Sequence, residues 1–308
     1  MIVEILEPGP LTSVQDPFGR RDWRHLGVPV GGAADSWSAR LANRLVGNPD
    51  GAALLEVTLG GLALVVDETT WMATTGGLAA RAGGMDLPAG EAWRLRPGTI
   101  LRLDPGDGAR GYLAVAGGFL VEPVLGSTST DLRTGFGGLD GRPLRAGDQL
   151  EAAALTGRPA RWAGRATMGP IRIVPGPHGE DLEGLLAAWT VGLEADRAGV
   201  RLDGARIRGT EVPSMGLSPG AIQVPPDGRP IVMLADRPVT GGYGVPACVI
   251  RADIGRVAQL RTGDEVRFAS VTLEEAREAL RRAEAELAAL EPLNTAADDE
   301  LGWAGSHE

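Results

Sequence analysis

Short apolar segments separated by Gly, Pro and Asp run through most of the chain and constrain what it can fold into. They include "MIVEIL", "TILRL", "GYLAVAG", "IRIV", "IVMLA" and "ACVIRA". The 46 glycines and 22 prolines place turns at the intervals typical of a β-barrel or sandwich. The pattern therefore predicts a mainly β protein with a few short helices.

Helical patterns are confined to three places. One helix is predicted from about Asp35 to Val46, with Asp35 as its cap and Gly47-Asn48-Pro49 after its end. A second is predicted from about Glu180 to Trp189, where apolar residues recur every three or four positions.

The third helix lies at the C-terminus. Thr272 and Glu275 have the spacing of a capping box, and a narrow apolar seam follows up to Pro292. This seam fits packing on the same chain or on another chain. The acidic residues beyond the helix are expected to be loose.

At 308 residues the chain is long enough for two domains, and we expect β-barrel regions at 1–165 and 166–271, then the helix and tail at 272–308. It shows no basic and apolar leader and no apolar run of membrane-spanning length, so we expect a cytoplasmic protein without membrane contact. The single cysteine, Cys248, excludes a disulfide framework and is interpreted as a buried structural thiol.

All 30 basic residues are arginine, which excludes a Schiff-base lysine and a Walker-type phosphate lysine. Any bound anion must therefore be held by arginine, backbone N–H groups or a metal ion. The net charge of −10 argues against a nucleic-acid partner. His25, His178 and His307 lack metal-ligand spacing, so we predict no metal site on this chain.

Two segments recur along the chain. "PGTILRLDPGDGARGYLAVAGG" from Pro97 is similar to "PGAIQVPPDGRPIVMLADRPVTGG" from Pro219, and "LRAGDQL" from Leu144 is similar to "LRTGDEV" from Leu260. The repetition suggests a duplicated β unit, although such turns are common between strands. Only the second copy carries an Asp-Arg pair, which makes that pair a candidate site.

That pair, Asp236 and Arg237, follows a predicted buried strand and precedes "TGGYG". An exposed ion pair would contribute only about 0 to 1 kcal/mol to stability. Adjacent glycines let backbone approach a ligand closely and present N–H groups to an anion, which favours a binding site. We interpret Asp236 and Arg237 as catalytic, with substrate contacts from Gln223, Gly241, Gly242 and Tyr243.

A second cluster lies in the loop "RRDWRH" before the Asp35 helix. Arg20, Arg24 and His25 are interpreted there as substrate-binding residues that face an anion, although a solvated loop is an equal alternative. The hydroxyl-rich stretch from Gly126 to Asp148 has no Ser-His-Asp spacing and is interpreted as a turn-rich hairpin.

Seven motifs in order resemble one family. They are "VQD…GR", "GVPxxGAxD", "RLANRLVGN", "LEVTLGG", "GSTSTDLRTGFGGLDGRPLRAGD", "PPDGRPIVMLADRPVTGGY" and "RTGDEVRF". Together they resemble the biotin-dependent carboxyltransferase family, which includes a 5-oxoprolinase subunit, KipI antagonists, allophanate hydrolase subunit 2 and the carboxyltransferase domain of urea carboxylase. The resemblance extends from about Leu6 to Phe268.

The resemblance implies two cyclophilin-like β-barrels and a smaller KipI-type partner, encoded separately or fused and also called allophanate hydrolase subunit 1. It often implies a third protein that binds 5-oxoproline. The activity it implies is ATP-dependent opening of 5-oxoproline to glutamate, with Mg²⁺ supplied at the level of the complex. Many relatives have "GGYPKIA" where this chain has Gly244-Val245-Pro246-Ala247, so the lysine of that motif is absent here. Any catalytic step that the lysine performs in those relatives is therefore in doubt for this chain.

Two alternatives stay open. One is carboxyl transfer from carboxybiotin to urea or a related amide. It needs a biotin carboxylase and a biotin carrier elsewhere, because this lysine-free chain has no covalent biotin site. The other is a non-catalytic regulator that binds a kinase inhibitor. In either enzyme the chain lacks a P-loop and a recognisable nucleophile–base pair, so we expect it to be inactive without its partner.

Overall fold

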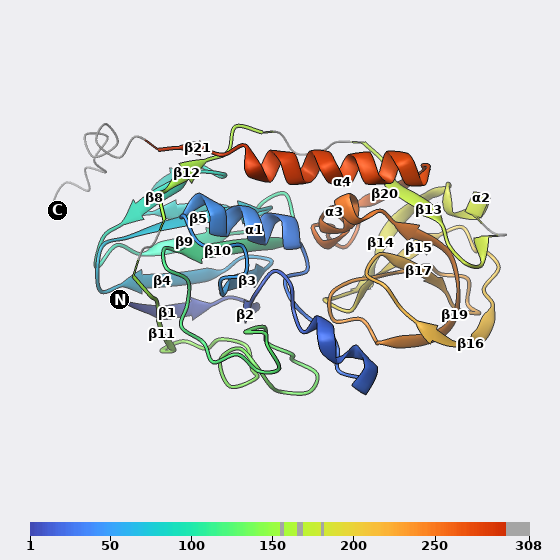
Figure 1. Cartoon of the computed structure of the whole chain (residues 1–308), viewed down its shortest axis with the longest axis horizontal. Helices are drawn as coiled ribbons and strands as arrows, with labels where there is room; N and C mark the ends of the chain where they lie inside the picture. The colour runs from blue at the N-terminus through green and yellow to red at the C-terminus, as the bar shows by residue number, and fades with distance from the viewer. Residues whose placement is uncertain (155–156, 165–168, 180–181, 294–308) are drawn as a thin grey trace.

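The computed structural model describes residues 1–154, 157–164, 169–179 and 182–293, and it is mainly β (Figure 1). In this part of the chain the strands form four sheets, and the helices lie beside and above them. The mainly β class with few helices is confirmed. The cyclophilin-like form of the predicted barrels and the predicted domain boundaries stay predictions.

Two antiparallel sheets form what we call the N-terminal unit. The first has the order β11 (Gln149–Glu151), β1 (Ile2–Pro8), β4 (Leu62–Val66), β9 (Leu101–Asp104), β6 (Ala79–Ala82) and β7 (Met85–Leu87). The second has the order β2 (Leu11–Gln15), β3 (Leu54–Thr58), β10 (Arg110–Val115), β5 (Thr70–Gly76) and β8 (Ala92–Leu95). Their apolar faces share one core.

Every residue of β10 is buried because the strand is covered on both faces. Leu113 and Val115 belong to the core between the sheets, whereas Tyr112 and Ala114 pack with α1 (Ser36–Leu45). Successive side chains of a strand point to opposite faces, so a continuous apolar run fits this position. As predicted, Asp35 caps α1, and its side chain accepts a hydrogen bond from the Ser38 N–H at 3.0 Å.

The C-terminal unit is one sheet of eight strands. Its order is β13 (Ile171–Pro175), β20 (Glu265–Ser270), β14 (Ala188–Ala195), β15 (Gly199–Gly204), β18 (Ile231–Met233), β17 (Ala221–Val224), β19 (Thr240–Val249) and β16 (Glu211–Gly216). β13 also pairs with β19, so the sheet closes on itself and leaves β16 outside the closure. Its interior holds a separate core that includes Trp189, Leu202 and Phe268.

The helix predicted from Glu180 to Trp189 is wrong over most of its length. α2 covers only Leu182–Leu185, Trp189 lies in β14, and residues 180–181 lie outside the described residues. Pairing of Trp189 with Val266 and Gly204 satisfies the strand backbone while its ring fills the core. Tertiary pairing therefore overrides the helical spacing of the apolar residues.

The C-terminal helix α4 (Leu273–Ala288) begins at the predicted capping box, with the Glu275 N–H donating to Thr272 Oγ1 at 3.2 Å. It lies along α1 and above η3 (Arg251–Asp253) and α3 (Ile254–Ala258) (Figure 1). Trp37 Nε1 donates to the Ala283 carbonyl at 3.1 Å, so α4 packs on its own chain.

The chain after α4 adds a final strand, β21 (Glu291–Pro292), which pairs with β12 (Ala160–Arg161). The predicted loose tail from residue 294 lies outside the described residues. Among the residues described, no helix combines the length and apolarity needed to span a bilayer.

The two copies of the shorter sequence repeat form the same turn. In one, the Arg145 N–H donates to Asp148 Oδ2 at 2.7 Å, and in the other the Arg261 N–H donates to Asp264 Oδ2 at 2.8 Å. The longer repeat differs, because β17 and β18 pair with each other while β9 and β10 belong to different sheets. The duplication is therefore visible at one turn and not in the strand pairing around Asp236.

Candidate functional site

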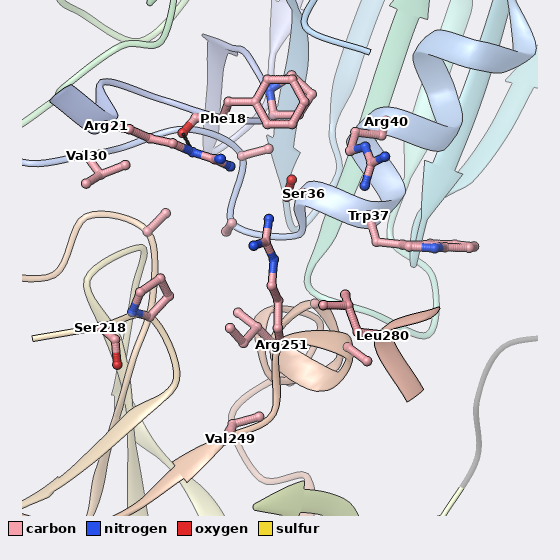
Figure 2. A pocket seen from close by; sticks show the side chains of 18 of the residues that line it. Phe18, Arg21, Val30, Ser36, Trp37, Arg40, Ser218, Val249, Arg251 and Leu280 are labelled. Atoms are coloured by element: carbon pink, nitrogen blue, oxygen red, sulfur yellow. Dashed lines mark hydrogen bonds between the residues drawn. The ribbon is translucent and has the colours of Figure 1, made fainter. Parts of the chain in front are cut away.

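A cavity of about 500 Å³ lies where the two units and α4 meet. Its wall is built from the loop before α1, the start of α1, the segments after β18 and β19, and one face of α4. Five arginines line it, and we call it the arginine cleft after them: Arg21, Arg24, Arg40, Arg237 and Arg251. Figure 2 shows Arg21 and Arg251 pointing into the same space from opposite walls, near the Ser36 hydroxyl at the start of α1.

One of the five arginines is neutralised by carboxylates. Arg40 donates to both oxygens of Glu284 on α4, each at 2.7 Å, and to Asp50 at 2.8 Å. Among the described residues, the other four arginines of the cleft form no ion pair. The cleft wall thus carries four guanidinium groups without a carboxylate partner, in a chain whose net charge is −10.

The four guanidinium groups are close enough to influence one another. Burial lowers the pKa of Arg237 to about 10, and the charge of Arg24 adds to this effect. Burial also lowers the pKa of Arg21, with Arg251 as the next largest cause. The cleft is therefore a site where an anion would relieve repulsion between like charges.

Arg237 is held in place by the backbone around it. Its Nε donates to the Leu217 carbonyl at 3.0 Å and its Nη1 to the Leu234 carbonyl at 3.2 Å. Arg21 lies over the Phe18 ring, with 5.1 Å between its guanidinium carbon and the ring centre. These contacts fix part of each guanidinium group and leave its charge available to the cleft.

Asp236 points away from the cleft into a buried ion network that joins the two units. Arg197 donates to Asp236 from Nε at 2.8 Å and from Nη2 at 2.9 Å, and it also donates to Glu56 of β3. Glu56 accepts further hydrogen bonds from the Ala34 N–H at 2.8 Å and the Tyr112 hydroxyl at 2.9 Å. We call Glu56, Tyr112, Arg197 and Asp236 the buried network.

The two carboxylates of this network differ. Burial alone would raise the pKa of Glu56, but the charges of Arg197 and Arg110 hold it below its usual value. The pKa of Asp236 is raised by burial and by the charges of Glu56 and Asp131, although Arg197 acts in the opposite direction. Glu56 is therefore the better-stabilised anion of the two.

The predicted residues around β19 come together away from the cleft wall. Gln223 is buried, and its Nε2 donates to the Tyr243 carbonyl at 3.3 Å. A Cβ on Gly241 would lie 2.6 Å from that same Nε2, so a larger residue here would displace the Gln223 amide. Gly242 and Tyr243 lie in β19 beside β16, and the Tyr243 side chain is 38% exposed.

The three residues that we predicted in the N-terminal loop do not lie in one site. Arg24 lines the cleft from η1 (Arg21–Leu26), whereas Arg20 is 1% exposed and donates from Nε to the Val124 carbonyl at 3.0 Å. His25 is exposed, with its Nδ1 3.0 Å from the Asp22 carbonyl oxygen. Of the nine residues that we predicted for the site, the structure therefore brings Arg24 and Arg237 to the cleft.

Sequence reasoning missed Arg40 and Arg251 and did not select Arg21 from its loop. Arg251 lies two positions after the end of β19 and begins η3, so its place after a buried strand was the available signal. Arg40 is half-buried on α1, where spacing alone predicts a solvated charge. Within the described residues, no three His, Cys, Asp or Glu side chains gather as a metal site would require.

Comparison with known proteins agrees with the mainly β fold. The carboxyltransferase domain family, subdomains A and B, matches residues 26–270. The chain is 39% identical over 301 residues to a 5-oxoprolinase subunit of Escherichia coli K12, covering 90% of this chain and 94% of that protein.

Two solved structures are similar. One, titled TTHA0988, is 42% identical with a TM-score of 0.81, and the match covers 87% of this chain and 56% of that chain. The other, the urea amidolyase of K. lactis, is 30% identical with a TM-score of 0.87, and the match covers 93% of this chain and only 20% of that one. From its matching residues and its likeness to these proteins, the chain belongs to the carboxyltransferase domain family, subdomains A and B.

Proposed function

We propose that this chain is a subunit of an ATP-dependent 5-oxoprolinase, which opens the lactam of 5-oxoproline to glutamate together with a KipI-type partner in the cytoplasm. The relative from Escherichia coli is named as a subunit of 5-oxoprolinase and is matched over nearly its whole length. The observation that carries the proposal is the arginine cleft, where four guanidinium groups lack carboxylate partners among the described residues.

The chemistry of lactam opening suits such a cleft. An amide carbon is a poor electrophile, and phosphoryl transfer to the amide oxygen activates it for attack by water. Both the phosphate donor and the product carboxylate are anions. Guanidinium groups in a partly buried site bind them by charge-assisted, often bidentate hydrogen bonds and stabilise charge that develops in the transition state.

A second candidate function is supported by the likeness to the K. lactis urea amidolyase. It is carboxyl transfer to urea or a related amide, with biotin carried on another protein or domain. The same cleft would then hold a carboxylate-bearing reactant. A purely regulatory role as a binding partner remains the third alternative.

The test is co-expression of the chain with a KipI-type subunit and the third, 5-oxoproline-binding component. We expect a complex that co-elutes on size exclusion and forms glutamate from 5-oxoproline and ATP, and little turnover by the isolated chain. A stable complex that forms no glutamate would contradict the proposal. Carboxylation of urea by the complex, when a biotin carboxylase and a biotin carrier are added, would favour the second function.

A further inference from the structure

The geometry points to a ligand with several adjacent anionic groups, and we infer that the arginine cleft binds the phosphate chain of a nucleotide. This inference rests on the proposed function, in which a phosphate donor is a reactant. It deepens that function by assigning the donor to this chain and leaving 5-oxoproline to another part of the complex.

The number of available charges carries the inference. Arg21, Arg24, Arg237 and Arg251 have no ion-pair partner among the described residues, and Glu284 is the single acidic residue of the cleft wall. A monocarboxylate such as 5-oxoproline would neutralise one of the four guanidinium charges. A di- or triphosphate would neutralise most of them.

The arrangement of these charges also fits a chain of phosphates. They come from three separate segments, since Arg21 and Arg24 lie on η1, Arg237 follows β18, and Arg251 begins η3. Figure 2 shows Arg21 and Arg251 reaching in from opposite walls. Anionic groups along an extended ligand can therefore meet guanidinium groups on both sides, each through a planar fork of donors.

The remaining wall suits the rest of a nucleotide. The volume of about 500 Å³ lies within the range of about 300 to 1,000 Å³ that small-molecule sites occupy. Phe18, Trp37, Ile254 and Leu280 supply apolar surface beside the arginines. The Ser36 hydroxyl adds a neutral donor at the start of α1 (Figure 2).

The experiment is calorimetric titration of the full chain at fixed ionic strength with ATP, ADP, AMP, inorganic triphosphate and 5-oxoproline. We expect affinity to rise with the number of phosphates and inorganic triphosphate to bind about as well as ATP. Arg251→Ala should weaken ATP binding about tenfold, the loss of one hydrogen-bonded charge contact. Arg24→Ala should weaken it by a similar or smaller factor.

The matched control is Arg267→Ala, which removes an exposed arginine of β20 outside the cleft. It should change ATP affinity less than about twofold, because its charge is screened at that distance. Thermal unfolding of each variant checks that the fold is retained. Arg251 is exposed and donates no hydrogen bond to a described residue, so its replacement should be tolerated.

Three results would overturn the inference: absence of binding by both ATP and inorganic triphosphate, equal losses in Arg251→Ala and Arg267→Ala, or a loss confined to 5-oxoproline binding. These results are separate from failure of the proposed function. A complex that binds ATP in this cleft but forms no glutamate contradicts the function alone. Glutamate formation with ATP binding unaffected by Arg251→Ala contradicts the inference alone.

Discussion

Arginines lie at two places where the units meet, Arg197 in the buried network and the arginines of the cleft, and they differ in their partners. In the buried network, Arg197 is 5% exposed and is bonded to two carboxylates, one from each unit. In the arginine cleft, Arg24 and Arg251 are exposed and have no carboxylate partner among the described residues. Arginine is therefore neutralised by carboxylates at one contact between the units and keeps an uncompensated charge at the other.

The difference separates stability from binding. A buried guanidinium needs acceptors for its N–H groups or a partner charge, because these offset the cost of removing it from water. Arg197 has two carboxylates, whereas Arg237, also buried, has the Leu217 and Leu234 carbonyls. A cluster of unpaired guanidinium groups is tolerated only where water or an anion reaches it. Replacement of Arg197 should therefore lower stability more than ligand affinity. Replacement of an arginine of the cleft should lower ligand affinity more than stability.

The largest effect should come from Arg197→Met. This change leaves Glu56 and Asp236 buried without their shared cation, and loss of one partner of a buried pair typically costs about 3 to 5 kcal/mol. Urea unfolding should show that loss, while Arg251→Ala should lower the free energy of unfolding by less than about 0.5 kcal/mol. Similar losses in the two variants would abolish the distinction between the groups.

A smaller stability effect is expected from Glu56→Gln, and it should depend on pH. The folded-state pKa of Glu56 is lowered, so its contribution is present above the unfolded value of 4.5 and is lost as pH falls through the folded value. We expect Glu56→Gln to lower the free energy of unfolding by about 1 to 3 kcal/mol at pH 7. This loss should shrink as the pH falls below 4.5, and unfolding measured across pH should show it.

Asp236→Asn is the control for this titration. Because the folded-state pKa of Asp236 is raised, its ionisation opposes folding at neutral pH, and this contribution has the opposite sign. The stability difference between wild type and Asp236→Asn should therefore not shrink on acidification in the way expected for Glu56→Gln. The same pH dependence in both variants would contradict the assignment of Glu56 as the better-stabilised anion.

The next effect concerns binding, through Arg237→Lys. Lysine keeps the charge but cannot donate to the Leu217 and Leu234 carbonyls while facing the cleft with a planar fork. We expect ATP affinity and kcat/KM of the complex to fall about tenfold, equivalent to one charge-assisted hydrogen bond. Arg24→Lys, at an exposed position, should lose less, and wild-type kinetics in Arg237→Lys would remove that residue from the site.

The sequence predicted the β class because Gly and Pro bound short apolar runs, and it predicted α1 and α4 because their caps are local. The helix up to Trp189 failed because that residue is fixed by strands distant in sequence, β15 and β20. Asp236 and Arg237 are adjacent in the segment after β18 but have different partners, since Asp236 accepts from Arg197 and Arg237 donates to backbone carbonyls. Their different partners, Arg197 and the cleft, follow only from the packing of the two units.

The same reason explains the site residues that sequence reasoning missed. Arg21, Arg40 and Arg251 are separated by up to 230 positions, and no local pattern connects them. Arg20 is close to Arg21 in sequence, yet it donates to the Val124 carbonyl inside the N-terminal unit. Spacing predicts neighbours on one element, whereas this cleft is assembled from loops and helix ends of both units.

The smallest effect should come from Glu284→Gln and should have the opposite sign. Glu284 brings a carboxylate from α4 into the cleft wall, where it accepts two hydrogen bonds from Arg40 and where Arg40 and Arg251 lower its pKa. The carboxylate thus neutralises one arginine and repels an incoming anion. Its removal should tighten binding of inorganic triphosphate about two- to threefold at low salt, an exposed-charge effect that salt screens.

Glu278→Gln on the same helix is the matched control. Glu278 pairs with Arg281 and Arg282 on α4 and does not line the cleft, so its replacement should leave affinity unchanged. If Glu284→Gln instead weakened triphosphate binding at every salt concentration, the Arg40–Glu284 contact would serve to hold α4 against the cleft. In that case Arg40 would join two elements as Arg197 does in the buried network, and the arginines of the cleft would no longer differ from Arg197 by charge alone.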